Sequence, residues 1–352
     1  MTKGCAALVW TPDAVRVLTG SGEFKLGLVI DRRDRFGLRL WSDHAGQLYL
    51  RVIDERQPLW ISADKGATFQ AVPPIPVEDK PVSAYNYKLH SASGIISALG
   101  HHVVWIYDAV GGQWKSRELP SDMHVKDISI DGQQGFWFAG SVDSRRIPGE
   151  KTEAAMRYQA ASGTAFQPRS PHLSYVDAVK VIKDGGLTEL RTVEAEAEPV
   201  VATSLCSWLL DDSSSFIFTF DSKRTFVSRL KAELISHIDR SSNSLRLFTY
   251  QGSAWERNGN RWERRHSLVA PIERSLKVSG RKILIRGLDV RREKIAAAVE
   301  VSPPGATDVA QDPELTAICL SVDNGISFEV THQLVSKSSA EIHDVVWLGG
   351  RP

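Results

Sequence analysis

The chain has 352 residues, of which 42% are hydrophobic and 24% are charged, a composition typical of an ordinary soluble globular protein. Its formal net charge of +1 excludes a global attraction to nucleic acid or to an anionic membrane. Its three cysteines, Cys5, Cys206 and Cys319, are far apart and odd in number, which excludes a disulfide framework or a zinc motif. They are interpreted as inert thiols in a reducing compartment.

The N-terminus contains no apolar run of the length found in signal peptides. No other run approaches the length of a transmembrane helix. We therefore expect a cytoplasmic protein. At this length, a single all-β unit with a large buried core is feasible.

Short runs rich in valine and aromatic residues fill most of the chain, and Gly, Asn, Asp and Ser separate them. Helical periodicity is scarce, and residues 228–238 fit either a short helix or the start of a strand. Many short strands at even spacing, with turn residues between them, indicate a sandwich, a barrel or a propeller. A long-period repeat distinguishes the propeller from the other two.

Two segments share one pattern: WISADKGATF at 60–69 and CLSVDNGISF at 319–328. Each contains Ser-x-Asp-x-Gly, followed by a hydroxyl residue and an aromatic. We predict a hairpin turn in each, in which the aspartate accepts hydrogen bonds from nearby backbone N–H groups and the glycine adopts a positive φ. The residues with these structural roles are Ser62, Asp64, Gly66, Phe69, Ser321, Asp323, Gly325 and Phe328.

Four weaker hairpins keep only part of this pattern, at 105–114, 156–166, 217–226 and 255–262. With the two complete copies, they end at aromatic residues that are about 52 residues apart on average, close to the roughly 40–50 residues of a four-stranded propeller blade. The sequence therefore predicts an all-β fold, a single β-propeller domain over residues 1–352. We expect seven four-stranded blades, with six as the alternative.

The predicted blades comprise six continuous segments and one that combines both chain ends. The continuous segments are 38–72, 83–117, 126–168, 176–228, 234–267 and 282–330. The last blade is predicted to combine 342–352 with 5–31. Joining both termini in one sheet closes the ring and removes an open sheet edge.

The two complete turns resemble the Asp-box repeat of bacterial neuraminidases, which occurs in β-propellers. For the sialidase family, the resemblance implies an Arg-Ile-Pro motif whose arginine binds the substrate carboxylate, and Arg146 begins such a motif here. In that family the motif precedes the first box, whereas here it follows it, and spacing places no Tyr–Glu nucleophile pair. Arg146 is therefore interpreted as a solvated loop residue. In the resembling families the boxes lie at the blade periphery, so they indicate a fold and not a binding site.

No cofactor, metal site or catalytic residue is predicted. A calcium loop requires several oxygen ligands and a terminal glutamate, whereas each box turn offers a single carboxylate. His101 and His102 are sequence neighbours, so in a strand they point to opposite faces and do not share a metal. No sequence string typical of a nucleophile or a nucleotide loop is present.

One region combines arginine with tryptophan, the composition of interface hot spots. Trp255 and Trp262 flank an Asn-Gly turn among charged residues, and Arg264 and Arg265 follow after Glu263. With Arg146, these four residues are the predicted contact surface.

These observations favour a non-enzymatic recognition or scaffold propeller that binds a protein partner through loops on one face. A bacterial toxin-neutralising (immunity) protein or a complex-assembly factor would fit this description. The alternative is a sialidase-like glycoside hydrolase or a polysaccharide lyase with paired acidic residues in the central funnel. A glycan-binding lectin is the third hypothesis. No nucleic-acid or membrane partner is expected.

Overall fold

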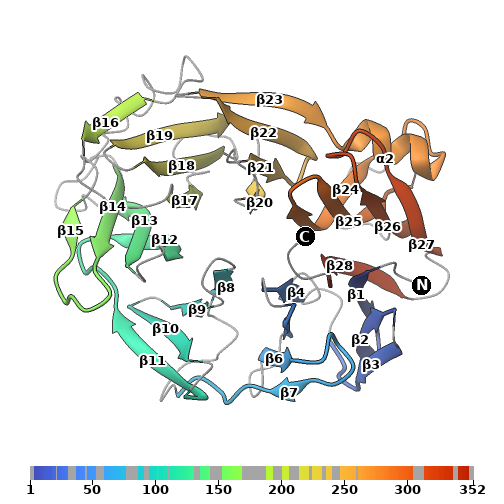
Figure 1. Cartoon of the computed structure of the whole chain (residues 1–352), viewed down its shortest axis with the longest axis horizontal. Coiled ribbons are helices and arrows are strands. Elements are labelled where there is room, and N and C mark those ends of the chain that lie inside the picture. The colour runs from blue at the N-terminus through green and yellow to red at the C-terminus, as the bar shows by residue number, and fades with distance from the viewer. Residues whose placement is uncertain are drawn as a thin grey trace. The chain divides into compact units, whose positions relative to one another are not determined.

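The computed structural model describes the chain with gaps, and the structural statements below refer to its described residues (Figure 1). These residues are 4–20, 22–30, 37–43, 46–52, 59–76, 86–90, 95–100, 102–108, 111–130, 135–142, 153–168, 188–192, 200–205, 214–221, 224–231, 235–239, 246–258, 261–303, 313–335 and 340–348. They form mostly β-strands, with one α-helix. No helix in this part of the chain is long and apolar enough to cross a membrane.

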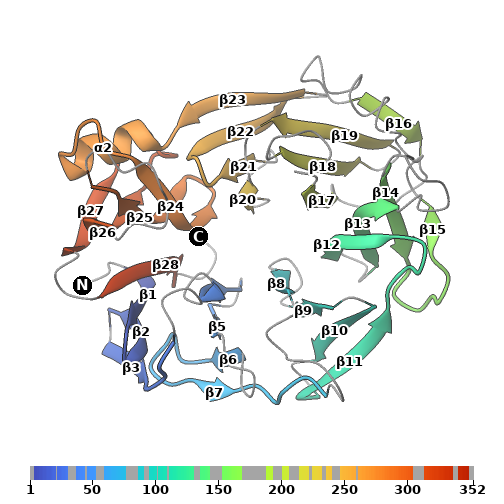
Figure 2. The same cartoon turned by 180° about the vertical axis from the view of Figure 1, so that it is seen from behind.

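The described strands form seven four-stranded sheets (Figures 1 and 2). Their bounds are β1 (Cys5–Thr11), β2 (Ala14–Thr19), β3 (Gly22–Leu26), β4 (Arg39–Ser42), β5 (Leu48–Arg51), β6 (Leu59–Ser62), β7 (Gln70–Ala71), β8 (Asn86–His90), β9 (Ile95–Leu99), β10 (Val103–Asp108), β11 (Gln113–Glu118), β12 (His124–Ile130), β13 (Phe136–Val142), β14 (Glu153–Gln159), β15 (Gln167–Pro168), β16 (Thr188–Thr192), β17 (Val200–Leu205), β18 (Ser214–Asp221), β19 (Arg224–Lys231), β20 (Ile235–Asp239), β21 (Arg246–Thr249), β22 (Ser253–Asn258), β23 (Arg261–Ser267), β24 (Ile283–Arg291), β25 (Lys294–Val301), β26 (Leu315–Ser321), β27 (Glu329–Val335) and β28 (Glu341–Trp347). In order of hydrogen-bonded neighbours, the sheets are β28-β1-β2-β3, β4-β5-β6-β7, β11-β10-β9-β8, β12-β13-β14-β15, β16-β19-β18-β17, β20-β21-β22-β23 and β24-β25-β26-β27.

The chain divides into two compact units, which are described separately. The first consists of Met1–Ala84, Ser236–Trp255 and Arg264–Pro352, and the second of Tyr85–Ile235 and Glu256–Glu263. The sheets formed by β28 with β1–β3, by β4–β7 and by β24–β27 lie within the first unit. Those formed by β8–β11, β12–β15 and β16–β19 lie within the second.

In the first unit, one sheet contains strands from both ends of the chain. Strand β28, red in Figure 1, pairs antiparallel with the blue β1 and places Trp347 opposite Cys5 and Val345 opposite Ala7. Strands β2 and β3 extend this sheet outward from β1. We call β28-β1-β2-β3 the terminal sheet. The predicted combination of the two chain ends in one sheet is therefore observed.

Strand β1 is buried on both faces. One face packs with the β4–β7 sheet in a cluster that includes Ala6, Leu8, Trp10, Leu40, Leu48 and Leu50. The other face packs with the β24–β27 sheet in a cluster that includes Cys5, Ala7, Val9, Ala296, Ala298, Ile318 and Leu320. Successive side chains of a strand point to opposite faces, so a strand covered on both sides is apolar throughout and not only at alternate positions.

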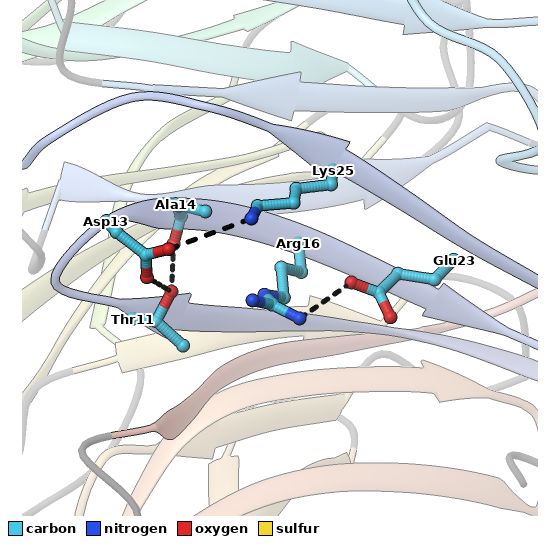
Figure 3. A network of polar contacts seen from close by, with 6 residues as sticks. All are labelled: Thr11, Asp13, Ala14, Arg16, Glu23 and Lys25. Atoms are coloured by element: carbon cyan, nitrogen blue, oxygen red, sulfur yellow. Dashed lines mark hydrogen bonds and ion pairs between the residues drawn. The ribbon is translucent and has the colours of Figure 1, made fainter.

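The outer strands of the terminal sheet carry a polar network (Figure 3). Arg16 of β2 lies 3.0 Å from the Glu23 carboxylate of β3, and Lys25 lies 3.7 Å from Asp13. The Thr11 hydroxyl lies 2.8 Å from Asp13 Oδ1, and this hydrogen bond is the main cause of the lowered pKa of Asp13. Ion pairs this exposed add little stability, but charges on an edge strand discourage pairing with another sheet.

Two cysteines, Cys5 and Cys319, are buried free thiols in the first unit. Burial raises the pKa of each to about 12, and the nearby Asp289 carboxylate adds to the effect at Cys5. The thiolate is the reactive form of cysteine, so these two residues are inert core side chains. Cys206 lies outside the described residues.

The helix α2 (Val269–Leu276) was not predicted, and it lies beside β27, as Figure 2 shows. Pro271 lies in the first turn of the helix, where backbone N–H groups have no acceptor within the helix, so its missing N–H costs no helical hydrogen bond. The helix ends at Lys277 in the left-handed conformation, a position usually held by glycine. The segment 228–238, for which the sequence left a helix or a strand open, contains parts of strands β19 and β20.

In the second unit, one sheet departs from chain order. Strand β16 is hydrogen-bonded to β19, at the edge opposite to β17, and β17 lies near β12. The core of this unit includes the stacked rings of Phe136 and Phe138. Arg117 of β11 lies 4.5 Å from the Phe136 ring centroid and donates a 3.0 Å hydrogen bond to Gln159 of β14. This arginine therefore connects two sheets of the unit.

Candidate functional site

The first box turn follows β6 and has the predicted bond from a backbone N–H to the aspartate, together with hydroxyl bonds that were not predicted. The Ser62 hydroxyl donates to Asp64 Oδ1 at 2.8 Å and accepts from the backbone N–H of Gly66 at 2.8 Å. The Thr68 backbone N–H and hydroxyl donate to the two oxygens of Asp64 at 2.9 and 2.6 Å. These bonds, that of the Thr68 side chain above all, lower the pKa of Asp64 to about 2.

The second box turn, after β26, repeats this geometry. The Ser321 hydroxyl donates to Asp323 Oδ1 at 2.7 Å and accepts from the Gly325 N–H at 2.8 Å. The Ser327 N–H and hydroxyl donate to Asp323 at 3.0 and 2.5 Å, and the pKa of Asp323 falls to about 2 mainly through the Ser327 hydroxyl. The predicted positive φ of the glycine is observed at Gly325 (83°) and at Gly66 (92°).

A second left-handed residue in each turn was not predicted. Lys65 and Asn324, which directly precede the glycines, have φ values of 59° and 62°. Asparagine adopts this conformation readily, whereas lysine does so only where its surroundings require it. The pattern Ser-x-Asp-x-Gly contains no signal for this position beyond the asparagine of the second copy.

Each box glycine also lies close to side chains from other parts of the first unit. A Cβ placed on Gly66 would lie 2.8 Å from Thr19 Cγ2 of β2, and one on Gly325 would lie 2.6 Å from Leu268 Cδ2 and 3.2 Å from His266 Nε2. Burial and the nearby Arg246 lower the pKa of His266, which keeps its imidazole neutral at pH 7. Glycine is therefore required at both positions for two reasons: a Cβ would clash with neighbouring atoms, and the backbone has a positive φ.

We expect Gly325→Ala to lower the free energy of unfolding by ~1–3 kcal/mol, because it adds a clash to backbone strain. Gly280→Ala is the matched control, since Gly280 also has a positive φ (66°) but nothing lies within 4 Å of its added Cβ. The measurement is chemical denaturation of both variants beside the unchanged protein. Equal losses in the two variants would show that packing at Gly325 contributes nothing.

The second box turn is fixed to the β24–β25 turn by a buried arginine. The Asn324 N–H donates to Glu293 O at 2.8 Å. Arg246 of β21 donates to Asn324 Oδ1 and to Arg292 O, and its Nε donates to Asp239 Oδ2 of β20 at 2.9 Å. Arg246 is 7% exposed and Asp239 is 2% exposed, so this ion pair is largely removed from solvent.

Two large aliphatic side chains project from this fixed turn into solvent. Val322 is 69% exposed and Ile326 is 70% exposed. The corresponding residues of the first box turn are the small Ala63 and Ala67. We call residues 292–294 and 322–327 the turn platform. Its exposed charged side chains are Arg292, Glu293 and Lys294.

The predicted contact surface is only partly consistent with the observed burial. Arg264 and Arg265 of β23 are exposed, and Trp255 of β22 is partly buried. Trp262, which was predicted as part of this contact surface, is buried at 5% exposure, because a large apolar ring is favoured inside despite the charged residues around it. Arg146 lies outside the described residues.

Val322 and Ile326 were not among the predicted contact residues. Those residues are arginines and tryptophans, whereas Val322 and Ile326 occupy variable positions of the box pattern. A comparison of those positions between the two copies would have found them, because the first copy has alanine at both.

Several acidic residues of the first unit form ion pairs with arginine. Arg286 Nε lies 2.5 Å from Glu300 Oε2, and Arg291 Nε lies 3.3 Å from Asp289 Oδ2. The Arg286–Glu300 pair connects β24 with β25, and the Arg246–Asp239 pair connects β21 with β20, whereas Arg291 and Asp289 both lie on β24. Among the described residues, no group of His, Cys, Asp and Glu is arranged to hold a metal ion.

No protein-family model matches the chain, and no match is found among curated proteins. The β-propeller domain of the Trilobed protease from Pyrococcus furiosus, described as having an open velcro topology, is similar in structure, with a TM-score of 0.52 and 8% identity. The similarity covers 94% of this chain and 95% of that one. The fold is that of a β-propeller.

Two further propeller-fold matches have equally low sequence identity. An acylaminoacyl peptidase from Pyrococcus horikoshii matches with a TM-score of 0.50 at 9% identity, over 90% of this chain and 49% of that one. A structure of YCF48 bound to D1 peptide matches with a TM-score of 0.45 at 12% identity, over 84% of this chain and 81% of that one. At such identities, none of these similarities informs on activity.

Proposed function

We propose that the seven sheets are the blades of one β-propeller domain spanning residues 1–352, and that the terminal sheet closes the ring. The support is the packing of β1 between two neighbouring sheets and the shared sheet of the two termini. The box turns at 62–68 and 321–327 are proposed to be Asp-box repeats, which their hydrogen bonds support. A cytoplasmic location remains a prediction from the sequence.

Within this domain, we propose a non-enzymatic recognition function: the protein binds a protein partner through the turn platform and the loops beside it. The observation that carries this proposal is the exposure of Val322 and Ile326 on a turn that is fixed by a buried ion pair. Exposed aliphatic side chains reduce solubility when they serve no purpose, and large ones gathered on one turn are typical of contact sites.

The rigidity of the platform supports the same proposal. Binding costs free energy whenever a loop has to be ordered, and a turn already fixed by its own hydrogen bonds avoids that cost. The exposed Arg264 and Arg265 precede His266, which lies against Gly325 of the platform. Arginine beside exposed aliphatic residues offers a partner both charged and apolar contacts. A recognition function of this kind requires no cofactor.

The test combines co-purification with an activity screen. The tagged protein is isolated from native lysate, and bound proteins are identified and quantified by mass spectrometry. In parallel, the purified protein is assayed for hydrolysis of sialosides and cleavage of polysaccharides. A stoichiometric protein partner without turnover is expected. Turnover that is lost when an acidic residue is replaced would instead favour the glycoside hydrolase or lyase.

A further inference from the structure

The C-terminal strand β28 is unusual in burying three titratable side chains. Six of its seven residues are buried, among them Glu341, His343 and Asp344. One edge of the strand pairs with β1. Two of its backbone N–H groups donate to side chains of the β24–β27 sheet instead: Ile342 to Thr316 Oγ1 at 3.1 Å and Trp347 to Asp289 Oδ2 at 2.7 Å.

The Asp344 carboxylate is enclosed between two other strands. Its Oδ2 accepts the Leu40 N–H of β4 at 2.9 Å, and its Oδ1 accepts the adjacent Val345 N–H at 3.0 Å. On the β24 side, a Cβ added to Gly287 would lie only 2.0 Å from Oδ1. Asp344 is 5% exposed. The carboxyl group is therefore enclosed while β28 is seated against both strands, and release of β28 would expose it to water.

The charged and titratable groups on the elements packed against β28 are few. On β4 the group is Arg39, and on β24 they are Asp289, Arg291 and Arg286, the last of which pairs with Glu300 of β25. Lys294 of β25 lies 5.9 Å from the Trp347 ring centroid. The thiols of Cys5 on β1 and Cys319 on β26 stay protonated. Within β28, His343 lies 3.5 Å from Glu341.

Burial raises the pKa of Asp344 from 3.8 to about 6. Arg39 and the hydrogen bonds from the Leu40 and Val345 N–H groups oppose this rise, and Asp289 adds a smaller contribution to it. When β28 is released into water, the pKa returns to its ordinary value. Between about pH 4 and pH 6, the seated strand therefore holds a proton that the released strand does not. Seating is favoured fully below about pH 4, and this advantage is lost as pH rises through 6.

We propose that β28 is a pH-sensitive clasp, which seats more firmly when Asp344 is protonated and opens locally more often when Asp344 is ionised. Opening breaks the β28–β1 pairing and the hydrogen bonds that β28 donates to Thr316 and Asp289, while the rest of the first unit stays folded. The clasp concerns closure of the terminal sheet and does not depend on the recognition function proposed above.

Hydrogen exchange of the full chain between pH 4 and pH 8, corrected for intrinsic exchange rates and read by mass spectrometry, tests the clasp. In peptides that cover 340–348 and 37–43, the opening constant should rise by about 100-fold across this range, the factor that a two-unit pKa difference gives. Peptides of β25 should show no such rise. A pH-independent opening of β28, or an equal rise in β25, would overturn the proposal.

Charge variants separate this role from a merely structural one. In Asp344→Asn the pH dependence of the β28 opening constant should disappear. In Asp43→Asn, which removes another buried carboxylate near β4, this pH dependence should remain.

Where Asp344→Asn does not fold, two other variants decide, because each changes the electric field at Asp344. Arg39→Gln should move the midpoint of the pH dependence to higher pH, and Asp289→Asn should move it to lower pH. If the midpoint of the pH dependence were unchanged in both variants, the proposed clasp would be wrong.

Discussion

Replacing Gly287 by alanine is expected to destabilise the protein by ~3 kcal/mol or more. The added Cβ would lie 2.0 Å from Asp344 Oδ1 and 2.7 Å from Asp344 Cα. A flexible side chain can rotate away from such a contact, but a backbone atom of a buried strand cannot. Strand β28 would therefore be pushed away from β24.

An irregularity in the pairing of β24 also favours glycine at position 287. The pairing of β24 with β25 shifts between Ile285 and Gly287, and glycine often occurs where a bulge brings another backbone close.

Denaturation with guanidinium chloride measures the effect. Gly27→Ala is the control, because Gly27 has an ordinary φ and nothing lies within 4 Å of its added Cβ. The account predicts a lower midpoint for Gly287→Ala and an unchanged one for Gly27→Ala. If both variants were as stable as the unchanged protein, β28 would not be seated against β24 as described.

Replacing Arg246 by methionine is expected to cost ~3–5 kcal/mol, because it leaves the buried Asp239 carboxylate without its partner. It also removes the hydrogen bonds to Asn324 and Arg292 O that fix the turn platform. The loss of unfolding free energy should therefore have two contributions, one from the unpaired Asp239 charge and one from the less firmly held turn.

A double-mutant cycle separates these two contributions. Asp239→Leu combined with Arg246→Met removes both charges, and the double variant should recover most of the stability that Arg246→Met loses. Unfolding by denaturant gives the four free energies. Losses that simply add would mean that the two residues do not interact. Hydrogen exchange at residues 322–327 should remain faster in the double variant, because the bonds to the turn are still missing.

The local chemistry of the box turns could be predicted because their interactions join residues that are close in sequence. Ser62, Asp64 and Thr68 bond to one another within a few positions, and so do their counterparts in the second turn. The combination of both chain ends in one sheet could also be predicted, from the spacing of the closing aromatic residues.

Contacts between residues that are far apart in sequence could not be predicted. Arg246 and Asn324 are separated by 78 positions, and Leu40 and Asp344 by 304. No pattern in a single sequence shows which buried arginine meets which turn. The strand order of the β16–β19 sheet and the burial of Trp262 likewise depend on tertiary packing and not on local pattern.

The turn platform offers a comparison within one chain. Both box turns share the hydrogen bonds of the aspartate with the serine and hydroxyl residues, but only the second presents large aliphatic side chains. Replacing Val322 and Ile326 by alanine makes the second turn like the first without touching a residue that holds it. The reverse changes at Ala63 and Ala67 add apolar surface to the first turn and serve as a control for nonspecific stickiness.

The most direct measurement is the affinity of the co-purified partner for the unchanged protein, for Val322→Ala/Ile326→Ala and for Ala63→Val/Ala67→Ile, by isothermal titration calorimetry. The account predicts that the first variant binds about tenfold more weakly or worse, as expected when several buried methyl groups are lost, and that the second binds normally. Unfolding midpoints should stay the same in both. Undiminished affinity in a folded Val322→Ala/Ile326→Ala variant would contradict recognition through the turn platform.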